Sequence, residues 1–366
     1  MVKKSAKELG IHFIIGLSGA ELSAEDKAHL KELHPIGVML RAHNFRDTLP
    51  YADWLKTLQD MLMAASALSG REKLLVAIDH EGGRIHRVPA PLTHFPSAQR
   101  YRPYAKQVAK TMALELGTIG INTYFGPVAD IFSNPKNTVI GERAFGGDAE
   151  SVAAAAAVFA RELARNGMLA IAKHFPGHGD TLEDSHFELP KLSCSKNDLL
   201  KRELIPFAKL IAEKVPAIMA AHIVIPALDT KLPCSLSHAS INGLLRGELG
   251  FDGVVITDDL DMQAILDNYT EEEIANHALQ AGNDILLFNH HPERAIKIRD
   301  KLPALLSSKL DLDRSRARIE MMLSKVRPSS FSKIPDQTLI CHQDLLQSIN
   351  LGKERTLKVA CARTKT

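Results

Sequence analysis

The chain has 366 residues, 45% of them apolar, and its 45 Lys and Arg residues nearly balance 43 Asp and Glu residues. The apolar fraction is ample for a large core, which excludes disordered and disulfide-scaffold classes. At about 150 residues per domain the length suggests two domains, but a (β/α)₈ barrel fills about 250 residues as one unit. With a net charge of +2 and no basic tract, the sequence predicts no nucleic-acid partner.

The N-terminus and the cysteines indicate a cytoplasmic protein. The apolar stretch Ile11–Leu17 is too short for a secretory signal and contains His12, so we interpret it as the first core strand. No apolar run approaches the roughly 18 residues that a membrane helix needs, which predicts no membrane partner. The cysteines form no C-x-x-C pair, and reduced thiols fit a reducing compartment. They are Cys194, Cys234, Cys341 and Cys361.

Eight short apolar runs alternate with helix-like segments along the chain, which is typical of a parallel sheet wrapped by helices. The runs are too continuously apolar for one-sided antiparallel strands, and their number favours a closed (β/α)₈ TIM-type barrel over an open sheet. The predicted strands are Ile11–Leu17, Gly37–Leu40, Leu74–Asp79, Ile121–Val128, Leu169–His174, Ala217–Ile223, Gly253–Thr257 and Asp284–Phe288. The predicted helices begin after Ser23 and cover Ala153–Ala164, Leu199–Glu213, Ile241–Leu249, Glu271–Ala281 and Glu293–Leu302.

The pattern weakens near residue 330, so we expect one barrel domain over residues 1–330. Residues 331–366 are too few for an independent domain and contain one possible short helix at Gln343–Ile349. This extension is either a strap against the barrel or a loose tail, and the sequence leaves both open.

Polar side chains stand at the ends of most predicted strands. In a (β/α)₈ barrel the C-terminal strand ends converge on one mouth, where active sites lie. One polar strand end is ordinary, but six facing one mouth would be costly without a polar ligand. The six positions are Asp79, Asp130, Lys173–His174, His222, Asp258 and Asn289.

The loop Lys173–Pro190 is the longest segment with functional character. Its histidines and carboxylates suggest a metal, but their spacing matches no zinc motif and Lys173 adjoins His174, so we expect no metal. Asp184 and His186 are two residues apart, which lets the carboxylate hold one imidazole nitrogen and raise the basicity of the other. The pair is therefore a candidate for proton transfer near neutral pH.

Two further strand ends carry candidate site residues. After the third strand, Gly82–Gly83 permits a tight turn, and Arg84 and Arg87 offer forked donors for hydroxyl or carboxylate groups. After the seventh, Asp258 and Asp259 are adjacent. We expect one of them to face the mouth and the other to brace the next segment.

Taken together, the motifs resemble glycoside hydrolase family 3, specifically the compact single-barrel β-N-acetylglucosaminidases (β-hexosaminidases) of bacterial peptidoglycan recycling. The resemblance runs in order from about residue 11 to residue 305, and the KHFPGHGD–DSH combination is its most specific part. The matching segments are IDHEGGR, FGPVADI, VIGERAFGGD, KHFPGHGDTLEDSH, AAHIVIPALD, LRGELGFDGVVITDDLDM and AGNDILLF.

The resemblance implies a retaining exo-acting enzyme that removes terminal GlcNAc from muropeptides containing anhydro-N-acetylmuramic acid. It implies Asp258 as nucleophile and His186 as general acid/base with Asp184 as its partner. It implies no cofactor, a small carbohydrate as substrate and no obligatory protein partner. Glu81 and Arg84 are expected to support the glycine-rich turn. The residues implied to hold the GlcNAc ring are Asp79, Arg87, Arg143, Lys173 and His174.

The sequence also departs from the family, and other functions stay open. His80 stands where the family has Gln, and MLRAHNF near the second strand differs from the common run. A histidine donor would not repel phosphate, so a GlcNAc phosphorylase is one alternative. A non-catalytic muropeptide-binding sensor is another. From chemistry alone, the competing hypothesis is a metal-dependent barrel hydrolase.

Overall fold

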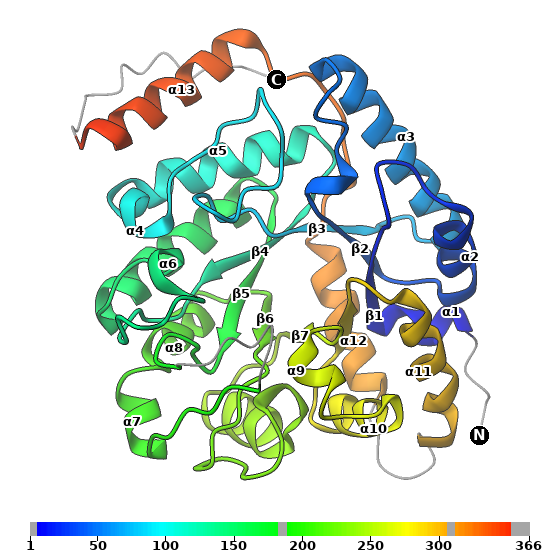
Figure 1. Cartoon of the computed structure of the whole chain (residues 1–366), viewed down its shortest axis with the longest axis vertical. Coiled ribbons are helices and arrows are strands. Elements are labelled where there is room, and N and C mark those ends of the chain that lie inside the picture. Colours follow the sequence, from blue (N-terminus) through cyan, green and yellow to red (C-terminus); the bar gives the residue numbers. More distant parts are fainter. Residues whose placement is uncertain (1–5, 182–188, 306–311, 353–366) are drawn as a thin grey trace.

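A closed barrel of eight parallel strands in chain order forms the centre of the computed structural model, which describes residues 6–181, 189–305 and 312–352 (Figure 1). β1 pairs with β2 on one side and with β8 on the other, which closes the sheet. The TIM-type barrel and all eight predicted strands are confirmed. The strands are β1 (Phe13–Gly16), β2 (Gly37–Leu40), β3 (Leu75–Ile78), β4 (Thr123–Val128), β5 (Leu169–Phe175), β6 (Ala217–Ala220), β7 (Val254–Asp259) and β8 (Ile285–Phe288).

The strands are apolar throughout because both of their faces are covered. One core cluster lines the inside of the barrel, and it includes Ile14, Phe125 and Ile256. Helix α12 (Leu312–Ser324) adds Ile319 and Met322 to this inner cluster. A larger outer cluster joins the strands to the surrounding helices. The inside of the barrel is thereby filled with side chains, and the strand ends that can carry an active site are the C-terminal ones.

The helices largely follow the sequence prediction. Ser23 caps α2 through a capping box with Asp26. The predicted helix Leu199–Glu213 is wrong as one element, because Arg202 leaves helical geometry at φ −134° and a second helix starts at Ile205, with Pro206 in its first turn. The helices are α1 (Ala6–Leu9), α2 (Ala24–Leu33), α3 (Tyr51–Ser69), α4 (Ala98–Tyr101), α5 (Ala105–Thr118), α6 (Ala149–Arg165), α7 (Lys196–Lys201), α8 (Ile205–Ala212), the π-helix η6 (Ala239–Glu248), α9 (Gln263–Leu266), α10 (Glu271–Gln280), α11 (Pro292–Leu305), α12 and α13 (Asp336–Leu351).

Past residue 326 the chain crosses the barrel and ends its described part in α13, beside α5 (Figure 1). Ser332 N donates to Thr118 O at 2.9 Å, and the Phe331 ring packs on Gly120. His342 Nδ1 lies 2.8 Å from Glu115 Oε1. The described part of the extension is therefore a strap, and we propose that residues 331–366 are an extension of the barrel domain.

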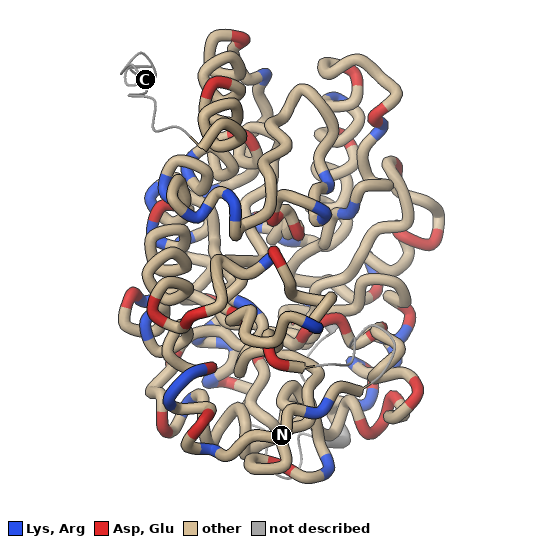
Figure 2. Tube along the Cα trace, turned by 60° about the vertical axis from the view of Figure 1, so that its left-hand side comes forward, with Lys and Arg blue, Asp and Glu red and all other residues tan. Residues whose placement is uncertain are grey.

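Charged residues do not divide the molecule into acidic and basic sides. In the view of Figure 2, the Lys and Arg positions are interspersed with the Asp and Glu positions along the whole trace. No helix in the described part of the chain is both long and apolar enough to cross a membrane.

The loop between β3 and α4 holds three histidine rings against one another. The ring centroids of His86 and His94 are 3.8 Å apart, and those of His80 and His86 are 4.5 Å apart. Gly82, at φ +86°, makes the turn that brings the loop back onto the backbone of Phe95 and Pro96. His80 Nδ1 accepts a hydrogen bond from the Arg87 N–H at 3.3 Å. The rings thus position the segment that carries Arg87.

Burial and the adjacent rings keep His80 and His86 neutral. Burial, with His86, His94 and Arg87 nearby, lowers the pKa of His80 well below its usual value. Burial and His94 also lower the pKa of His86 to about 4. The unfolded chain takes up protons as the pH falls through about 6.5, whereas the folded chain does not. Folding stability is therefore complete above that pH and declines below it.

We predict that His80→Gln reduces this acid sensitivity. Glutamine cannot take up the proton, and its amide oxygen can still accept from the Arg87 N–H. Between pH 7 and pH 5, the free energy of unfolding should fall by about 2 kcal/mol less in the variant than in the parent protein. Urea unfolding at both pH values measures this difference. His29→Gln, on α2, is the matched control, and an unchanged pH dependence in His80→Gln would contradict the prediction.

Candidate active site

A polar cavity of about 440 Å³ opens at the C-terminal end of the barrel strands. Six of the eight predicted site residues line it, although they come from four separate segments of the chain. They are Asp79, Arg87, Arg143, Lys173, His174 and Asp258. The remaining two, Asp184 and His186, lie outside the described residues.

Lys173 is the most deeply buried cation of the cavity, with a side chain 2% exposed. Its Nζ contacts a carboxylate oxygen of Asp79 and lies 2.6 Å from Glu81 Oε1. Burial opposes the charged form, but these two carboxylates raise the pKa of Lys173 above its usual value. The ammonium group is therefore charged and fixed between the end of β5 and the end of β3.

Glu81 joins this ammonium group to Arg143. The two residues form a forked ion pair, with Arg143 Nε 2.7 Å from Oε2 and Nη2 2.8 Å from Oε1. Despite its burial, the two cations hold the pKa of Glu81 far below its usual value. Glu81 was expected to support the glycine-rich turn, but its side chain instead neutralises site cations. Arg84, in contrast, donates to the backbone carbonyls of Thr138 and Val139.

The strand-end pattern predicted that Asp130 faces the cavity mouth, and this prediction is wrong. It is fully buried, and its Oδ2 lies 2.6 Å from His174 Nδ1. Its Oδ1 accepts from the backbone N–H of His178 at 2.7 Å. Because Asp130 binds Nδ1 of His174, the other ring nitrogen faces the cavity that His174 lines.

His222 and the first residues of the loop after β5 bind neighbouring segments and do not face the cavity. His222 is fully buried, and its ring lies 2.9 Å from Asp259 O and 2.7 Å from Ser235 Oγ. His178 Nδ1 lies 2.7 Å from Thr181 Oγ1, and Asp180 accepts from Arg202 at 2.5 Å. These contacts anchor the loop up to the point where its described part ends.

Asp258 and Asp259, adjacent on β7, have opposite electrostatic environments. Burial would raise the pKa of Asp258, but His174, His222 and the Asp259 N–H lower it below its usual value. Burial and the carboxylate of Asp261 raise the pKa of Asp259 to about 8. Asp259 Oδ1 accepts from the N–H groups of Asp261 and Asn289 at 3.0 and 3.1 Å. At neutral pH, Asp258 is thus the ionised carboxylate and Asp259 is the brace.

The cavity rim contains basic side chains that the sequence analysis did not single out. Arg41 follows β2 directly, and its Nη1 lies 2.9 Å from a ring nitrogen of His290. Both residues line the cavity, as does His291. The strand-end rule applied to β2 would have found Arg41, since it is the first residue after the strand.

A metal centre is not visible in the described part of the chain. Within residues 6–181, 189–305 and 312–352, no group of three or more His, Cys, Asp and Glu side chains could hold a metal ion. Instead, the cavity holds the ionised carboxylate of Asp258 beside fixed hydrogen-bond donors. That donor set is suited to binding a polyhydroxylated ligand.

The chain is similar in sequence and in fold to known glycoside hydrolases. Residues 3–326 match the glycosyl hydrolase family 3 N terminal domain. The β-hexosaminidase of Methylococcus capsulatus is 37% identical over 298 residues, which are 78% of this chain and 85% of that protein. The β-hexosaminidase of Methylobacillus flagellatus is 33% identical, over 90% of this chain and 93% of that protein.

Solved structures agree with the sequence relatives. A family 3 β-N-acetylglucosaminidase from Paenibacillus superposes with a TM-score of 0.84 at 35% identity, covering 95% of this chain and 68% of that one. NagZ from Neisseria gonorrhoeae, in complex with N-trifluoroacetyl-D-glucosamine, gives 0.74 at 28% identity, covering 92% and 96%. The resemblance noted in the sequence is thus confirmed, and the chain belongs to glycosyl hydrolase family 3.

Proposed function

We propose that this chain is a retaining exo-β-N-acetylglucosaminidase that releases terminal GlcNAc from muropeptides of the GlcNAc–anhydroMurNAc type. Its membership in the family and its β-hexosaminidase relatives make it a glycoside hydrolase of the β-N-acetylhexosaminidase class. The observation that supports the finer proposal is the environment of Asp258, an ionised carboxylate in a cavity lined by fixed cations. Peptidoglycan recycling in the cytoplasm is the corresponding biological role, and the free thiols of Cys194, Cys234 and Cys341 fit that compartment.

Asp258 is suited to attack the anomeric carbon of the sugar. The carboxylate forms a glycosyl ester as the bond to the leaving oxygen breaks. Water then attacks the anomeric carbon from the face opposite Asp258, and the bond to the carboxylate breaks. Two inversions give net retention. The lowered pKa keeps the group ionised, and the Asp259 N–H, 2.8 Å from Asp258 Oδ1, fixes its orientation.

The leaving oxygen needs a proton, which we assign to His186 with Asp184 as its partner. An imidazolium close to an ionised carboxylate is stabilised, whereas a second carboxylate would be repelled. After the first step the neutral imidazole can take a proton from the attacking water.

The walls of the cavity are suited to holding the sugar hydroxyl groups. Lys173 and Arg87 donate hydrogen bonds, Asp79 accepts them, and the cavity-facing nitrogen of His174 adds another polar contact. Arg143 acts mainly through Glu81, because that carboxylate occupies two of its nitrogens. Donors of this kind strengthen as charge develops on the ring.

The rim favours an anionic leaving group. Arg41, His290 and His291 stand beside the cavity that would hold the terminal sugar. Muropeptides carry carboxylates in their peptide stem. The guanidinium group of Arg41 attracts such a group and contributes to selecting it over a neutral aglycone.

Product analysis tests this function. Incubation with a GlcNAc–anhydroMurNAc peptide should release GlcNAc whose first-formed anomer is β, as followed by NMR. In phosphate buffer, formation of GlcNAc-1-phosphate would replace the hydrolase by a phosphorylase. If the protein turns over neither this substrate nor an aryl GlcNAc glycoside, it is instead a binding protein.

The two adjacent aspartates provide a matched test of the nucleophile. Asp258→Asn should lower kcat by at least about 10³-fold, because the covalent step is lost. Asp259→Asn should stay within about tenfold of the parent, because Asp259 is already protonated at neutral pH and the amide oxygen can accept the same N–H groups. Mass spectrometry with a slow fluorinated GlcNAc analogue should place the adduct on Asp258. An adduct on Asp259 or Glu81 would refute the assignment.

Substrates with good and poor leaving groups test whether His186 is the general acid. Removing a general acid costs about 10²–10⁴-fold, but only where the leaving group needs protonation. His186→Ala should therefore impair hydrolysis of natural disaccharides far more than glycosyl-enzyme formation from dinitrophenyl glycosides. Asp184→Asn should move the upper limb of the pH–rate profile to lower pH, and the double variant should be little worse than His186→Ala. His238→Ala, at the opposite end of the barrel, is the control. Equal losses on both leaving groups would mean that His186 only positions substrate.

A further inference from the structure

A buried carboxylate beside the loop that follows β5 is hydrogen-bonded through one of its oxygens. It belongs to Glu203, which lies between α7 and α8 and is 1% exposed. Its Oε1 lies 2.5 Å from Arg202 Nε, whereas its Oε2 has no hydrogen-bond partner in the part of the chain that the structure describes. Such an oxygen is costly to bury, so its presence here needs a reason.

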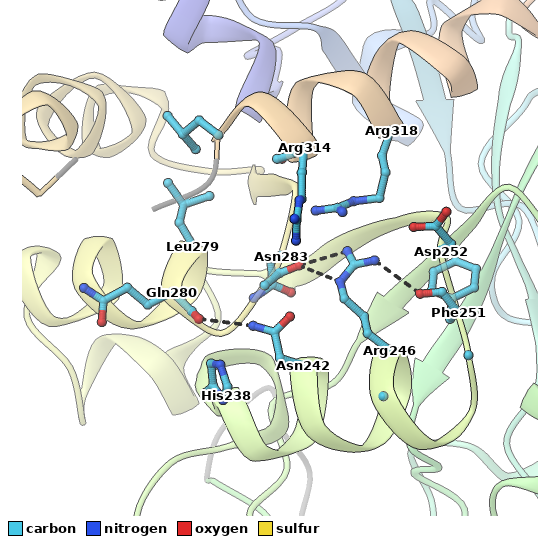
Figure 3. Close-up of a pocket in the computed structure, with 15 residues that line it drawn as sticks. His238, Asn242, Arg246, Phe251, Asp252, Leu279, Gln280, Asn283, Arg314 and Arg318 are labelled. Atoms are coloured by element: carbon cyan, nitrogen blue, oxygen red, sulfur yellow. Dashed lines mark hydrogen bonds between the residues drawn. The ribbon is translucent and has the colours of Figure 1, made fainter. Parts of the chain in front are cut away.

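Asp284, at the opposite end of the barrel, shows how this chain satisfies a buried carboxylate that serves packing. Both of its oxygens are bound, by the guanidinium groups of Arg318 and Arg246 and by the Val255 N–H. Figure 3 shows these two arginines facing each other from α12 and η6. Packing alone does not require a carboxylate at the position of Glu203, because an amide would fill the same space without the cost of burying a charge.

The unpaired oxygen of Glu203 faces the first residues of the loop after β5. A Cβ atom on Gly177 would lie 2.9 Å from Glu203 Oε2 and 3.0 Å from Glu203 Cβ, so the side chain packs directly on the Gly177 backbone. Gly177 has a φ of +131°, which residues with a side chain rarely adopt. The glycine therefore lets the loop lie on the carboxylate with no side chain between them.

Arg202 connects Glu203 to a second point of the same loop. Its Nε binds Glu203, and its Nη2 lies 2.5 Å from Asp180 Oδ2. The Arg202 side chain is 41% exposed, so its orientation depends on these two carboxylates. On the other side of the loop, Asn137 Nδ2 donates to the His178 carbonyl at 2.8 Å. Residues 177–181 are thus held between the loop after β4 and the junction of α7 with α8.

The charge of Glu203 changes near neutral pH. Burial raises the pKa of Glu203 to about 7, with Arg202 opposing this shift and the carboxylates of Asp180 and Asp130 adding to it. The thiol of Cys194, which precedes α7, also interacts with Glu203. An ionised acceptor makes a stronger hydrogen bond than a neutral one, so Arg202 is held most firmly when Glu203 is ionised.

We propose that Glu203 is a positioning residue for proton transfer, acting through Arg202 on the start of the loop that carries His186, whose role as general acid is the one proposed above. Asp180 precedes His186 by six positions, so a shift of residues 177–181 changes where the segment with His186 begins. The nucleophile Asp258 belongs to β7, so attack on a substrate with a good leaving group should not depend on Glu203.

Glu203→Gln tests the proposal, because the amide keeps the shape of the side chain and cannot ionise. At pH 8.5 the variant should hydrolyse the natural disaccharide at least about threefold more slowly than the parent. At pH 6, where Glu203 of the parent is already protonated, the two should be equal. Asp259 titrates in the same range, but comparing variant and parent at each pH removes its contribution.

A good leaving group separates positioning from a general structural effect. Glycosyl-enzyme formation from a dinitrophenyl glycoside should be unchanged in Glu203→Gln at both pH values, which also verifies that the variant is folded. Equal losses at both pH values, equal losses on both substrates, or no loss on the disaccharide at pH 8.5 would overturn the proposal.

Two further variants test the route through Arg202. Arg202→Gln should reproduce the loss at pH 8.5, and the double variant with Glu203→Gln should be no worse, because the two residues act as one unit. Glu213→Gln is the matched control, since it removes a carboxylate that follows α8 and pairs with Arg161 at the surface. It should have no effect at either pH. Additive losses in the double variant would contradict the route.

Amide hydrogen exchange tests the same contact without reference to activity. At pH 8.5, residues 177–181 should exchange at least about threefold faster in Glu203→Gln than in the parent, and at pH 6 the two should exchange equally. If the parent turns over neither substrate, the proposed function fails, but the exchange comparison still decides whether Glu203 holds the loop. Unchanged exchange at pH 8.5 overturns the proposal.

Discussion

The active-site end of the barrel depends on neutralising one buried ammonium group. Lys173 is 2% exposed, and a charge at such depth is unfavourable unless it is paired. Asp79 and Glu81 provide that pairing from the end of β3, and Arg143 balances the second carboxylate. Three separate segments are thereby joined by charge, and their donors are already oriented before a ligand arrives. Preorganised donors of this kind need little rearrangement when charge develops on a bound sugar.

The same local electrostatics separate two chemically identical neighbours on β7. Asp258 has imidazole rings and an ammonium group near it, whereas Asp259 has carboxylates on either side. Neither difference comes from β7 alone, because the rings belong to the ends of β5 and β6. Closing the barrel therefore decides which carboxylate is ionised, and this is the reason that a pair of adjacent aspartates can supply one nucleophile and one brace.

The sequence predicted the strands well and the side-chain partners poorly. A strand that is buried on both faces has a continuously apolar sequence, so all eight strands could be predicted. The break between α7 and α8 was missed because the apolar spacing continues across Arg202 and Pro206. Polar residues at the strand ends predicted which end of the barrel Asp130 would occupy. They did not predict which side chains Asp130 would bind. The pairing of Glu81 with Arg143, which is 62 positions further along the chain, depends on three-dimensional packing. The sequence alone therefore could not show it.

Strand β7 connects the two ends of the barrel, and each end is held by charge in a different way. At its C-terminal end, the carboxylate of Asp258 is surrounded by groups that stabilise its ionised form. At its N-terminal end, the Val255 N–H donates to Asp284, and that carboxylate binds Arg246 and Arg318. The upper charges line a polar cavity, whereas the lower ion pairs join β7 to β8 and α12. A barrel needs only packing at its base. The ion pairs of Asp284 serve that packing, because they hold η6 and α12 against the starts of β7 and β8.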